Sequence, residues 1–216
     1  MKKSYLLITV FLLSCFTIQA QQENIEPVQG KAMKRKLFFT VLVLLCAAFA
    51  VAGYTKVMAR IGSGTPPEMA AKSDQATEVR VIKSTRKLYL LRDDTVFRSY
   101  DISLGAAPKG HKSHEGDERT PVGRYLIDWR NDSSVAHLSL HISYPNAADK
   151  AAAQSVNLDP GGDIMIHGMP NGWGFLGRFQ TAWDWTNGCI AVNNAEMREI
   201  WSLVPNNTPI EIKDTP

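Results

Sequence analysis

Cysteine is scarce in this sequence, with three residues among 216. Cys15 and Cys46 lie inside two apolar runs near the N-terminus, so the remainder holds a single thiol, Cys189, and cannot form an internal disulfide. A lone thiol in an exported protein is exposed to oxidation, and its usual purpose is intermolecular pairing or reactivity. An inert buried cysteine is the alternative.

A net positive charge is lacking outside the N-terminus. Residues 1–60 contain eight of the 24 basic residues and two of the 21 acidic ones, which leaves 16 basic and 19 acidic residues in 61–216 and a formal charge of −3 there. Nucleic-acid-binding domains carry a basic patch or stripe. This sequence has none, which excludes nucleic acid as an expected partner.

A compact set of metal ligands is also lacking. His111 and His114 lie close together in a polar loop, but no second cysteine and no other nearby ligand accompanies them. A structural zinc site needs four ligands in a characteristic spacing. The sequence therefore predicts no metal site, and no cofactor is expected.

The N-terminus has two apolar runs, residues 5–18 and 37–52, each behind a basic flank, as in export signals. The second is slightly short for a membrane span, which takes about 17–25 residues, and it serves either as a cleaved signal or as an uncleaved membrane anchor. Met33 is an alternative start, and Cys15 loosely resembles a lipoprotein acylation site. We expect an export signal or anchor in 1–58, a linker in 59–77 and a periplasmic or envelope domain in 78–216.

Short alternating segments follow residue 78 and predict many strands. The expected strands are 78–83, 86–91, 95–103, 124–129, 137–143, 163–166, 189–192 and 209–212, and the expected helices are 146–155 and 193–203. Asn193 is the expected N-cap of the second helix, with Glu196 completing a capping box. Many strands and one or two short helices predict a mostly-β sandwich or barrel.

Cys189 has the surroundings that a nucleophile needs. Gly188 before it permits a tight turn, in which the N–H groups of Gly188 and Cys189 can point at a developing oxyanion. The thiol also needs a base, because only the thiolate reacts. Among the five histidines, His167 is the best candidate, since it ends an apolar strand and the Gly168 carbonyl can accept from its second ring nitrogen. A structural, hydrogen-bonded histidine is the alternative.

These residues form a pattern that resembles the YkuD-type L,D-transpeptidases. The resemblance rests on His167-Gly168, on Thr186-Asn187-Gly188-Cys189, on the run 116–123 with Thr120-Pro121, and on 143–146 with Tyr144. It covers about 78–213 and implies a YkuD-like β-sandwich or barrel. It also implies that Cys189 is the nucleophile, His167 the base and Gly168 the carbonyl partner, with Thr186, Asn187, Gly188, Tyr144 and Arg119 in oxyanion or substrate binding.

The resemblance implies a reaction as well. Cys189 attacks the peptidoglycan stem-peptide bond before the D-alanine at stem position four, and an amine on another stem peptide or on an envelope protein resolves the thioester. Two alternatives stay open: a cysteine amidase or carboxypeptidase that uses water as acceptor, and a non-catalytic peptidoglycan-binding domain.

The sequence departs from the family pattern at two positions. Asn187 stands where many members have His, and Ala191 stands where Arg is frequent. Asn187 can donate a hydrogen bond to an oxyanion but cannot carry a proton. A contact to a substrate carboxylate is then missing or comes from elsewhere, for example from Arg119 or Arg178. These departures resemble the YafK-like branch of the family.

The segment between the two motifs is rich in aromatic residues: Trp173, Phe175, Phe179, Trp183 and Trp185. It is expected either to cover the substrate as a flap or to pack onto the domain, with Trp185 the more firmly packed because it adjoins the cysteine motif.

Overall fold

The computed structural model of this chain describes residues 28–62 and 65–216. Contacts divide the chain into two compact units, Met1–Val51 and Ala52–Pro216. The apolar run 5–18, including the candidate acylation site Cys15, lies outside the described residues.

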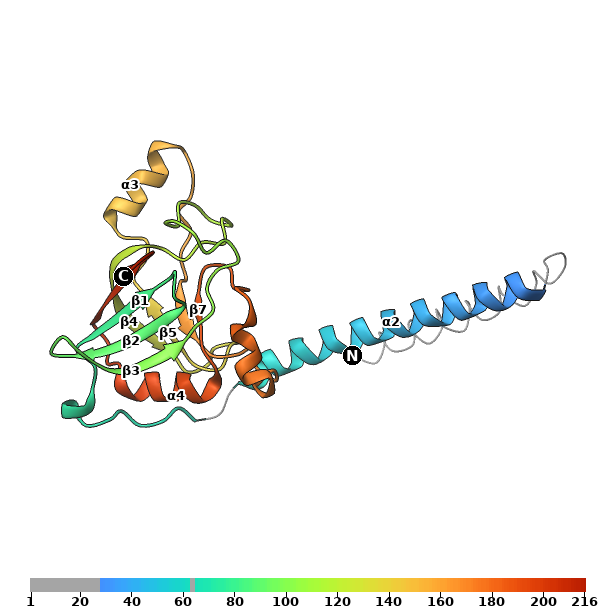
Figure 1. Cartoon of the computed structure of the whole chain (residues 1–216), viewed down its shortest axis with the longest axis horizontal. Coiled ribbons are helices and arrows are strands. Elements are labelled where there is room, and N and C mark those ends of the chain that lie inside the picture. The colour runs from blue at the N-terminus through green and yellow to red at the C-terminus, as the bar shows by residue number, and fades with distance from the viewer. Residues whose placement is uncertain (1–27, 63–64) are drawn as a thin grey trace. The chain divides into compact units, whose positions relative to one another are not determined.

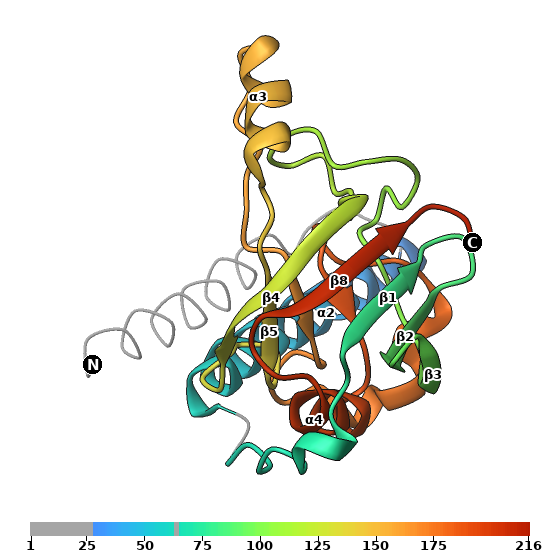
Figure 2. The same cartoon turned by 90° about the vertical axis from the view of Figure 1, so that its left-hand side faces the viewer.

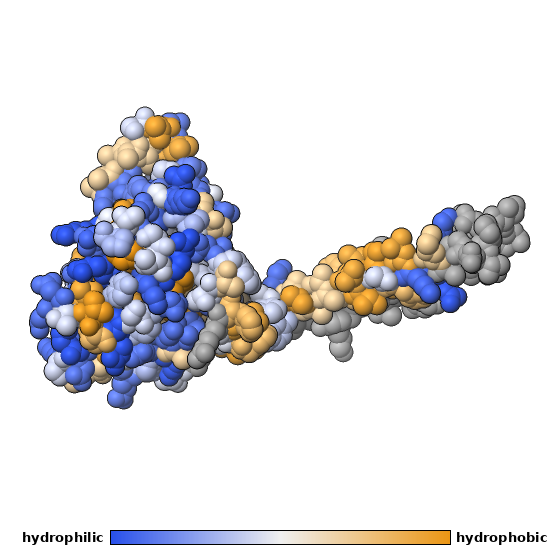
Figure 3. Space-filling view, in the orientation of Figure 1, coloured by the Kyte–Doolittle hydropathy of each residue, from blue (hydrophilic) through white to orange (hydrophobic). Residues whose placement is uncertain are grey.

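The second apolar run lies in one long helix, α2 (Val28–Ile61). Its stretch Met33–Ile61 has 29 residues and contains an 18-residue window with a mean hydropathy of 2.4, so it is long and apolar enough to cross a membrane. Most large apolar side chains of this stretch are exposed, as the space-filling view shows (Figure 3). The helix extends past both ends of the run 37–52, and its length therefore exceeds the roughly 16 residues expected from the apolar run alone.

The second unit is built on one eight-stranded mixed sheet in the order β3-β2-β1-β8-β4-β5-β6-β7 (Figures 1 and 2). The strands are β1 (Glu78–Ile82), β2 (Lys87–Arg92), β3 (Thr95–Asp101), β4 (Gly123–Asn131), β5 (Ser139–Ile142), β6 (Met165–His167), β7 (Ile190–Ala191) and β8 (Thr208–Lys213). The β1–β8 and β6–β7 pairs are parallel and the others antiparallel. The sheet is curled into a half-barrel. With eight strands in it, the predicted mostly-β fold is confirmed.

Alternating side chains explain why these segments form strands. In β1, Val79 and Val81 are fully buried, whereas Glu78 and Arg80 are partly exposed. In β8, Ile210 and Ile212 are buried in the same way. Since successive side chains of a strand point to opposite faces, one face of the sheet forms the core.

Two α-helices accompany the sheet: α3 (Ala147–Ser155) and α4 (Asn194–Leu203). The predicted cap of α4 is confirmed, because Asn193 Oδ1 accepts from the Glu196 N–H at 2.9 Å and the Glu196 carboxylate accepts from the Asn193 N–H at 3.2 Å. The helix buries Met197, Ile200 and Trp201 in the core.

Two segments that the sequence predicts as irregular are more ordered than expected. The expected linker contains the 3-10 turn η2 (Lys72–Asp74), and its Ala70 and Ala76 N–H groups donate to the carbonyls of Ser202 and Leu203. The aromatic segment forms a 3-10 helix, η3 (Gly174–Ala182), which is kinked at Gly177.

Candidate active site

Cys189 follows a tight turn that leads into β7. The Thr186 hydroxyl donates to the Cys189 carbonyl at 2.7 Å and accepts from the Gly188 N–H at 3.2 Å. Gly188 has φ 120°, and a Cβ there would lie 2.7 Å from the Arg119 carbonyl oxygen, so only glycine fits. Thr186 therefore shapes the turn, and the Gly188 N–H that the sequence assigns to an oxyanion already has a partner.

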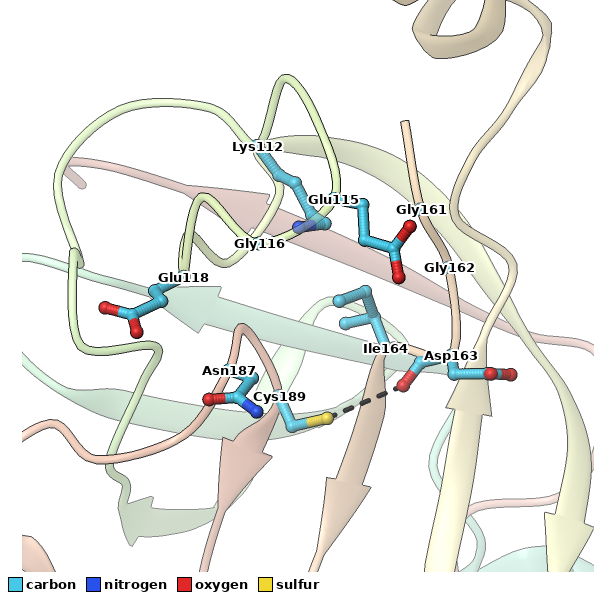
Figure 4. A pocket seen from close by; sticks show the side chains of 10 residues that line it. All are labelled: Lys112, Glu115, Gly116, Glu118, Gly161, Gly162, Asp163, Ile164, Asn187 and Cys189. Atoms are coloured by element: carbon cyan, nitrogen blue, oxygen red, sulfur yellow. Dashed lines mark hydrogen bonds between the residues drawn. The ribbon is translucent and has the colours of Figure 1, made fainter. Parts of the chain in front are cut away.

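The Cys189 thiol contacts two backbone groups, one just before β6 and one at the first residue of β6. Its Sγ accepts from the Met165 N–H at 3.4 Å and donates to the Asp163 carbonyl at 3.6 Å (Figure 4). Burial raises the pKa of the Cys189 thiol, while the Met165 N–H, which favours the thiolate, opposes the rise. The resting form is therefore the thiol.

His167 ends β6 and is buried beside the cysteine motif. Its Nδ1 donates to the Gly168 carbonyl at 2.6 Å, because a carbonyl can only accept, and this leaves Nε2 as the acceptor of the neutral ring. Burial lowers the pKa of His167, although the Gly168 bond favours the charged ring. The edge of Trp185 contacts the imidazole at a centroid distance of 5.8 Å.

Cys189 immediately precedes β7, which pairs in parallel with β6, the strand that His167 ends. Ile166 pairs with Ile190 and His167 with Ala191, so Cys189 lies two positions before the residue opposite His167. Within residues 28–62 and 65–216, no hydrogen bond joins the thiol to the imidazole. The pairing of β6 with β7 brings Cys189 and His167 to the same edge region of the sheet, and the thiol is oriented toward the Asp163 carbonyl.

A pocket of about 470 Å³ opens over the thiol (Figure 4). It is lined by Lys112, Glu115, Gly116, Glu118, Gly161, Gly162, Asp163, Ile164, Asn187 and Cys189. Lys112 is 3% exposed, and its ammonium is paired with Asp117 at 2.9 Å. The lining contains three carboxylates, those of Glu115, Glu118 and Asp163, and no basic residue besides Lys112. The pocket is therefore acidic.

The Asp117 carboxylate organises the loop that forms one wall of this pocket. It accepts from Lys112 Nζ and from the N–H groups of Ser113, His114 and Arg119. Burial alone would raise the pKa of Asp117, but these donors outweigh it and hold the pKa well below its usual range. Asp117 therefore stays ionised and keeps the wall in one conformation.

The structure separates the other predicted binding residues. Asn187 lines the pocket and lies beside Cys189 (Figure 4). Arg119 is not among the lining residues, and its exposed guanidinium reaches toward the His111 carbonyl at 3.5 Å. Tyr144 is 3% exposed, and its hydroxyl donates to the Pro160 carbonyl at 3.1 Å. Tyr144 therefore supports the loop before β6 and does not reach the pocket.

Sequence reasoning did not identify the groups that hold the site together. Asp163 contributes its carbonyl to the thiol, and the Asp184 carboxylate binds Arg86 at 2.6 Å and accepts from the Leu104 N–H at 2.9 Å. Arg86 and Leu104 are 80 or more residues from Asp184 in the sequence, so no local sequence pattern predicts these contacts. Among the described residues, no group of three or more His, Cys, Asp or Glu side chains is placed to hold a metal ion.

Residues 76–212 match the YkuD family, described as the L,D-transpeptidase catalytic domain. No curated protein matches the chain significantly.

Several solved structures resemble the chain at low identity. The helical cell shape determining protein Pgp2 from Campylobacter jejuni is 22% identical, with a TM-score of 0.48 over 75% of this chain and 56% of that one. Bd1075 from Bdellovibrio bacteriovorus is 20% identical, with a TM-score of 0.45 over 70% and 52%. An L,D-transpeptidase from Xylanimonas cellulosilytica is 16% identical, with a TM-score of 0.40 over 69% and 64%. The chain thus spans about half the length of the first two proteins. From the family match over most of its second unit, the chain belongs to the YkuD family of L,D-transpeptidase catalytic domains.

Proposed function

We propose that this chain is an L,D-transpeptidase of peptidoglycan with Cys189 as its nucleophile. One observation carries the proposal. The Cys189 thiol faces an open pocket, while on the neighbouring strand the Gly168 carbonyl holds His167 in the tautomer whose Nε2 can accept a proton. This is the nucleophile–base–orienter relationship of a cysteine acyltransferase.

The reaction consists of two acyl transfers. The sulfur attacks the carbonyl carbon of the stem-peptide bond before the D-alanine at stem position four, and His167 Nε2 takes the thiol proton. That proton passes to the nitrogen of D-alanine as the C–N bond breaks, which leaves a thioester on Cys189. An acceptor amine then attacks the thioester and gives up a proton to His167, and the proton returns to sulfur as the new amide forms.

The first proton transfer requires a small movement of the nucleophile. The thiol donates to the Asp163 carbonyl in the resting site, so its side chain turns toward His167 before it reacts. The Met165 N–H contact favours the thiolate once the proton has left. Asp163 and Met165 therefore act as positioning residues in this proposal.

Asn187 replaces the more frequent histidine as an oxyanion donor in this proposal. The Gly188 N–H is bound to Thr186, which leaves the Cys189 N–H and the Asn187 amide to face the substrate oxygen. Asn187 does not need to carry a proton in this role, because His167 is the only base that the mechanism uses.

The acidic lining supports an amine as the acceptor. Glu115, Glu118 and Asp163 line the pocket, and the Lys112 charge is paired with Asp117. A cationic amine gains favourable electrostatic energy on approaching this pocket. Ala191, which is fully buried, supplies no compensating charge.

Intact-protein mass spectrometry tests the proposal. The full chain in detergent is mixed with a carbapenem and, separately, with a disaccharide-tetrapeptide. We expect an adduct on Cys189 and release of D-alanine, with cross-linked dimer as product. The matched control is Cys189→Ala, which removes only the sulfur atom and should retain the unfolding transition but form no adduct.

The other outcomes point to the alternatives. Tripeptide without dimer indicates a hydrolase that uses water, and binding of the tetrapeptide without any adduct on folded protein indicates a non-catalytic peptidoglycan-binding domain. An adduct that persists in Cys189→Ala contradicts the assignment of the nucleophile.

The proposal places the domain in the cell envelope. Peptidoglycan lies outside the cytoplasmic membrane, and α2 is long and apolar enough to act as the export signal and remain as an anchor. An envelope protein is a further candidate for the acyl acceptor.

A further inference from the structure

The second unit exposes three large aromatic side chains within nine residues of its sequence. Phe175 is 75% exposed, Phe179 73% and Trp183 63%, all in η3 or directly after it. Figure 3 shows an apolar patch over this segment. Each such side chain would gain about 1.5–3 kcal/mol from burial, so a cluster of this kind marks a contact surface.

The opposite side of the segment is attached to the domain. Gln180 is 3% exposed, and its carbonyl accepts from the Ser103 hydroxyl at 2.6 Å. Directly after the segment, the Asp184 carboxylate binds Arg86 and the Leu104 N–H. The aromatic side chains therefore project from a backbone held at both its middle and its end.

The residues just before the segment contact the last turns of α2 within the second unit, Ala52–Pro216. The Tyr54 hydroxyl donates to the Gly172 carbonyl at 2.9 Å, and the Tyr54 and Trp173 rings meet edge to face at 5.9 Å. The Trp173 indole N–H donates to the Thr55 hydroxyl at 3.3 Å. Phe175 in turn stacks on Trp173 at 5.9 Å.

The sequence places this contact at the end of the apolar run. Tyr54 follows the run 37–52 by two residues, and the basic residues Lys56 and Arg60 come next. Tyrosine and tryptophan concentrate where a membrane meets water, and basic side chains beyond a span reach the lipid headgroups. A bilayer spanned by α2 would therefore end close to Tyr54 and Trp173.

We propose that residues 173–183 form a membrane-contact surface, in which Phe175, Phe179 and Trp183 enter the headgroup region of the bilayer that holds α2. The occupant of this surface is phospholipid. The contact is made by apolar groups, since residues 61–216 have a formal charge of −3 and their net charge is not attracted to the negative surface of an anionic membrane. The inference rests on the proposed envelope location and on retention of α2.

The inference connects the membrane to the candidate site. Trp183 is followed by Asp184, which binds Arg86, and by Trp185, whose ring contacts His167. If the segment is bound to the membrane, Trp185, which contacts His167, would be held at a fixed distance from the bilayer.

Fluorescence quenching tests the contact in the full chain reconstituted into phosphatidylethanolamine–phosphatidylglycerol vesicles. Lipids brominated near the headgroup quench tryptophans that enter the interface. Trp183 and Trp129 are both exposed, 63% and 40%, but Trp129 lies on β4 and not in the segment. We expect Trp183→Phe to lose a large part of the quenching and Trp129→Phe, the matched control, to lose none.

A second pair of variants tests the patch itself. Serine at Phe175, Phe179 and Trp183 should reduce quenching of the remaining tryptophans, whereas serine at the likewise exposed Val135, Val156 and Leu158 should not. Equal quenching in all variants overturns the inference. So does a patch that joins two copies of the chain, seen as cross-linked dimer without lipid quenching.

Carbapenem acylation separates this inference from the proposed function. In the unsubstituted chain, normal acylation without lipid quenching contradicts only the membrane contact, and lipid quenching without acylation contradicts only the enzymatic activity.

Discussion

The imidazole of His167 and the thiol of Cys189 both lose hydration in the folded protein, and burial shifts their pKa values in opposite directions. Burial lowers the pKa of His167 from its ordinary value and raises the pKa of Cys189. Between the two values the pair holds one proton in total, whether it is written as thiol with imidazole or as thiolate with imidazolium. The reactive protonation state is therefore available over a wide pH range.

This coupling predicts a broad pH plateau. The rate of carbapenem acylation of the wild-type chain should be nearly constant from about pH 7 to about pH 9. In His167→Ala only the thiolate reacts, so the rate should rise about tenfold per pH unit below the thiol pKa. Rapid-mixing mass spectrometry measures both profiles.

A variant with a side chain of similar volume controls for loss of folding in His167→Ala. His167→Gln should show the same slope as His167→Ala and retain the wild-type unfolding transition. A wild-type rate that also climbs about tenfold per pH unit would remove His167 from the role of base.

Asn187 provides the second prediction at this scale. Loss of one oxyanion donor costs about a hundredfold to a thousandfold in rate, so Asn187→Ala should slow acylation by that factor. No hydrogen bond of the Asn187 side chain is present among the described residues, and the side chain is exposed, so the unfolding transition should not move. An unchanged acylation rate would assign the oxyanion to other donors.

The segment 103–105 after β3 is the element that joins the parts of the site. Ser103 bridges to Ala191 and Gly105 to Thr186, on either side of Cys189. The Ser103 hydroxyl binds Gln180, and the Leu104 N–H binds Asp184. One short segment therefore holds the cysteine motif and the aromatic segment in register.

Gly105→Ala should disrupt this arrangement. A Cβ at Gly105 would lie 2.0 Å from the Glu118 carbonyl oxygen and 2.9 Å from the Gly188 Cα, and both are backbone atoms that cannot move aside easily. We expect a loss of about 1–3 kcal/mol in the free energy of unfolding and a larger loss of acylation. Denaturant unfolding and carbapenem acylation measure the two effects.

Gly162→Ala is the control for this prediction. Gly162 lines the pocket, and its Cβ would meet only a Pro145 side-chain atom at 3.9 Å, an ordinary contact distance. A destabilisation equal to that of Gly105→Ala would mean that the close approach of backbones is not the cause.

The strands and the capped helix could be predicted because their signals are local. Alternation of buried and exposed residues defines β1 and β8, and Asn193 with Glu196 marks the start of α4. The insertion of the C-terminal strand β8 between β1 and β4 depends on non-local pairing, which periodicity does not encode. For the same reason the bridges of 103–105 and the partners of Asp184 were not foreseen.

Charge divides the whole chain into an acidic domain and a basic-flanked apolar helix. Lys31, Lys34, Arg35 and Lys36 precede the run 37–52, and Lys56 and Arg60 follow it. The more basic end of a span remains on the cytoplasmic side. The bias of four residues against two therefore predicts that the domain leaves the cytoplasm.

Reversal of that bias tests the orientation. In a chain that begins at Met33 and is fused at its C-terminus to alkaline phosphatase, which is active only outside the cytoplasm, glutamate at Lys34, Arg35 and Lys36 should lower the reporter activity several-fold. Glutamate at Lys56 and Arg60 is the matched control and should leave the activity unchanged or raise it, because it strengthens the bias. Equal activity in both variants, with the fusion still bound to the membrane, would mean that the flanking charge does not orient the helix.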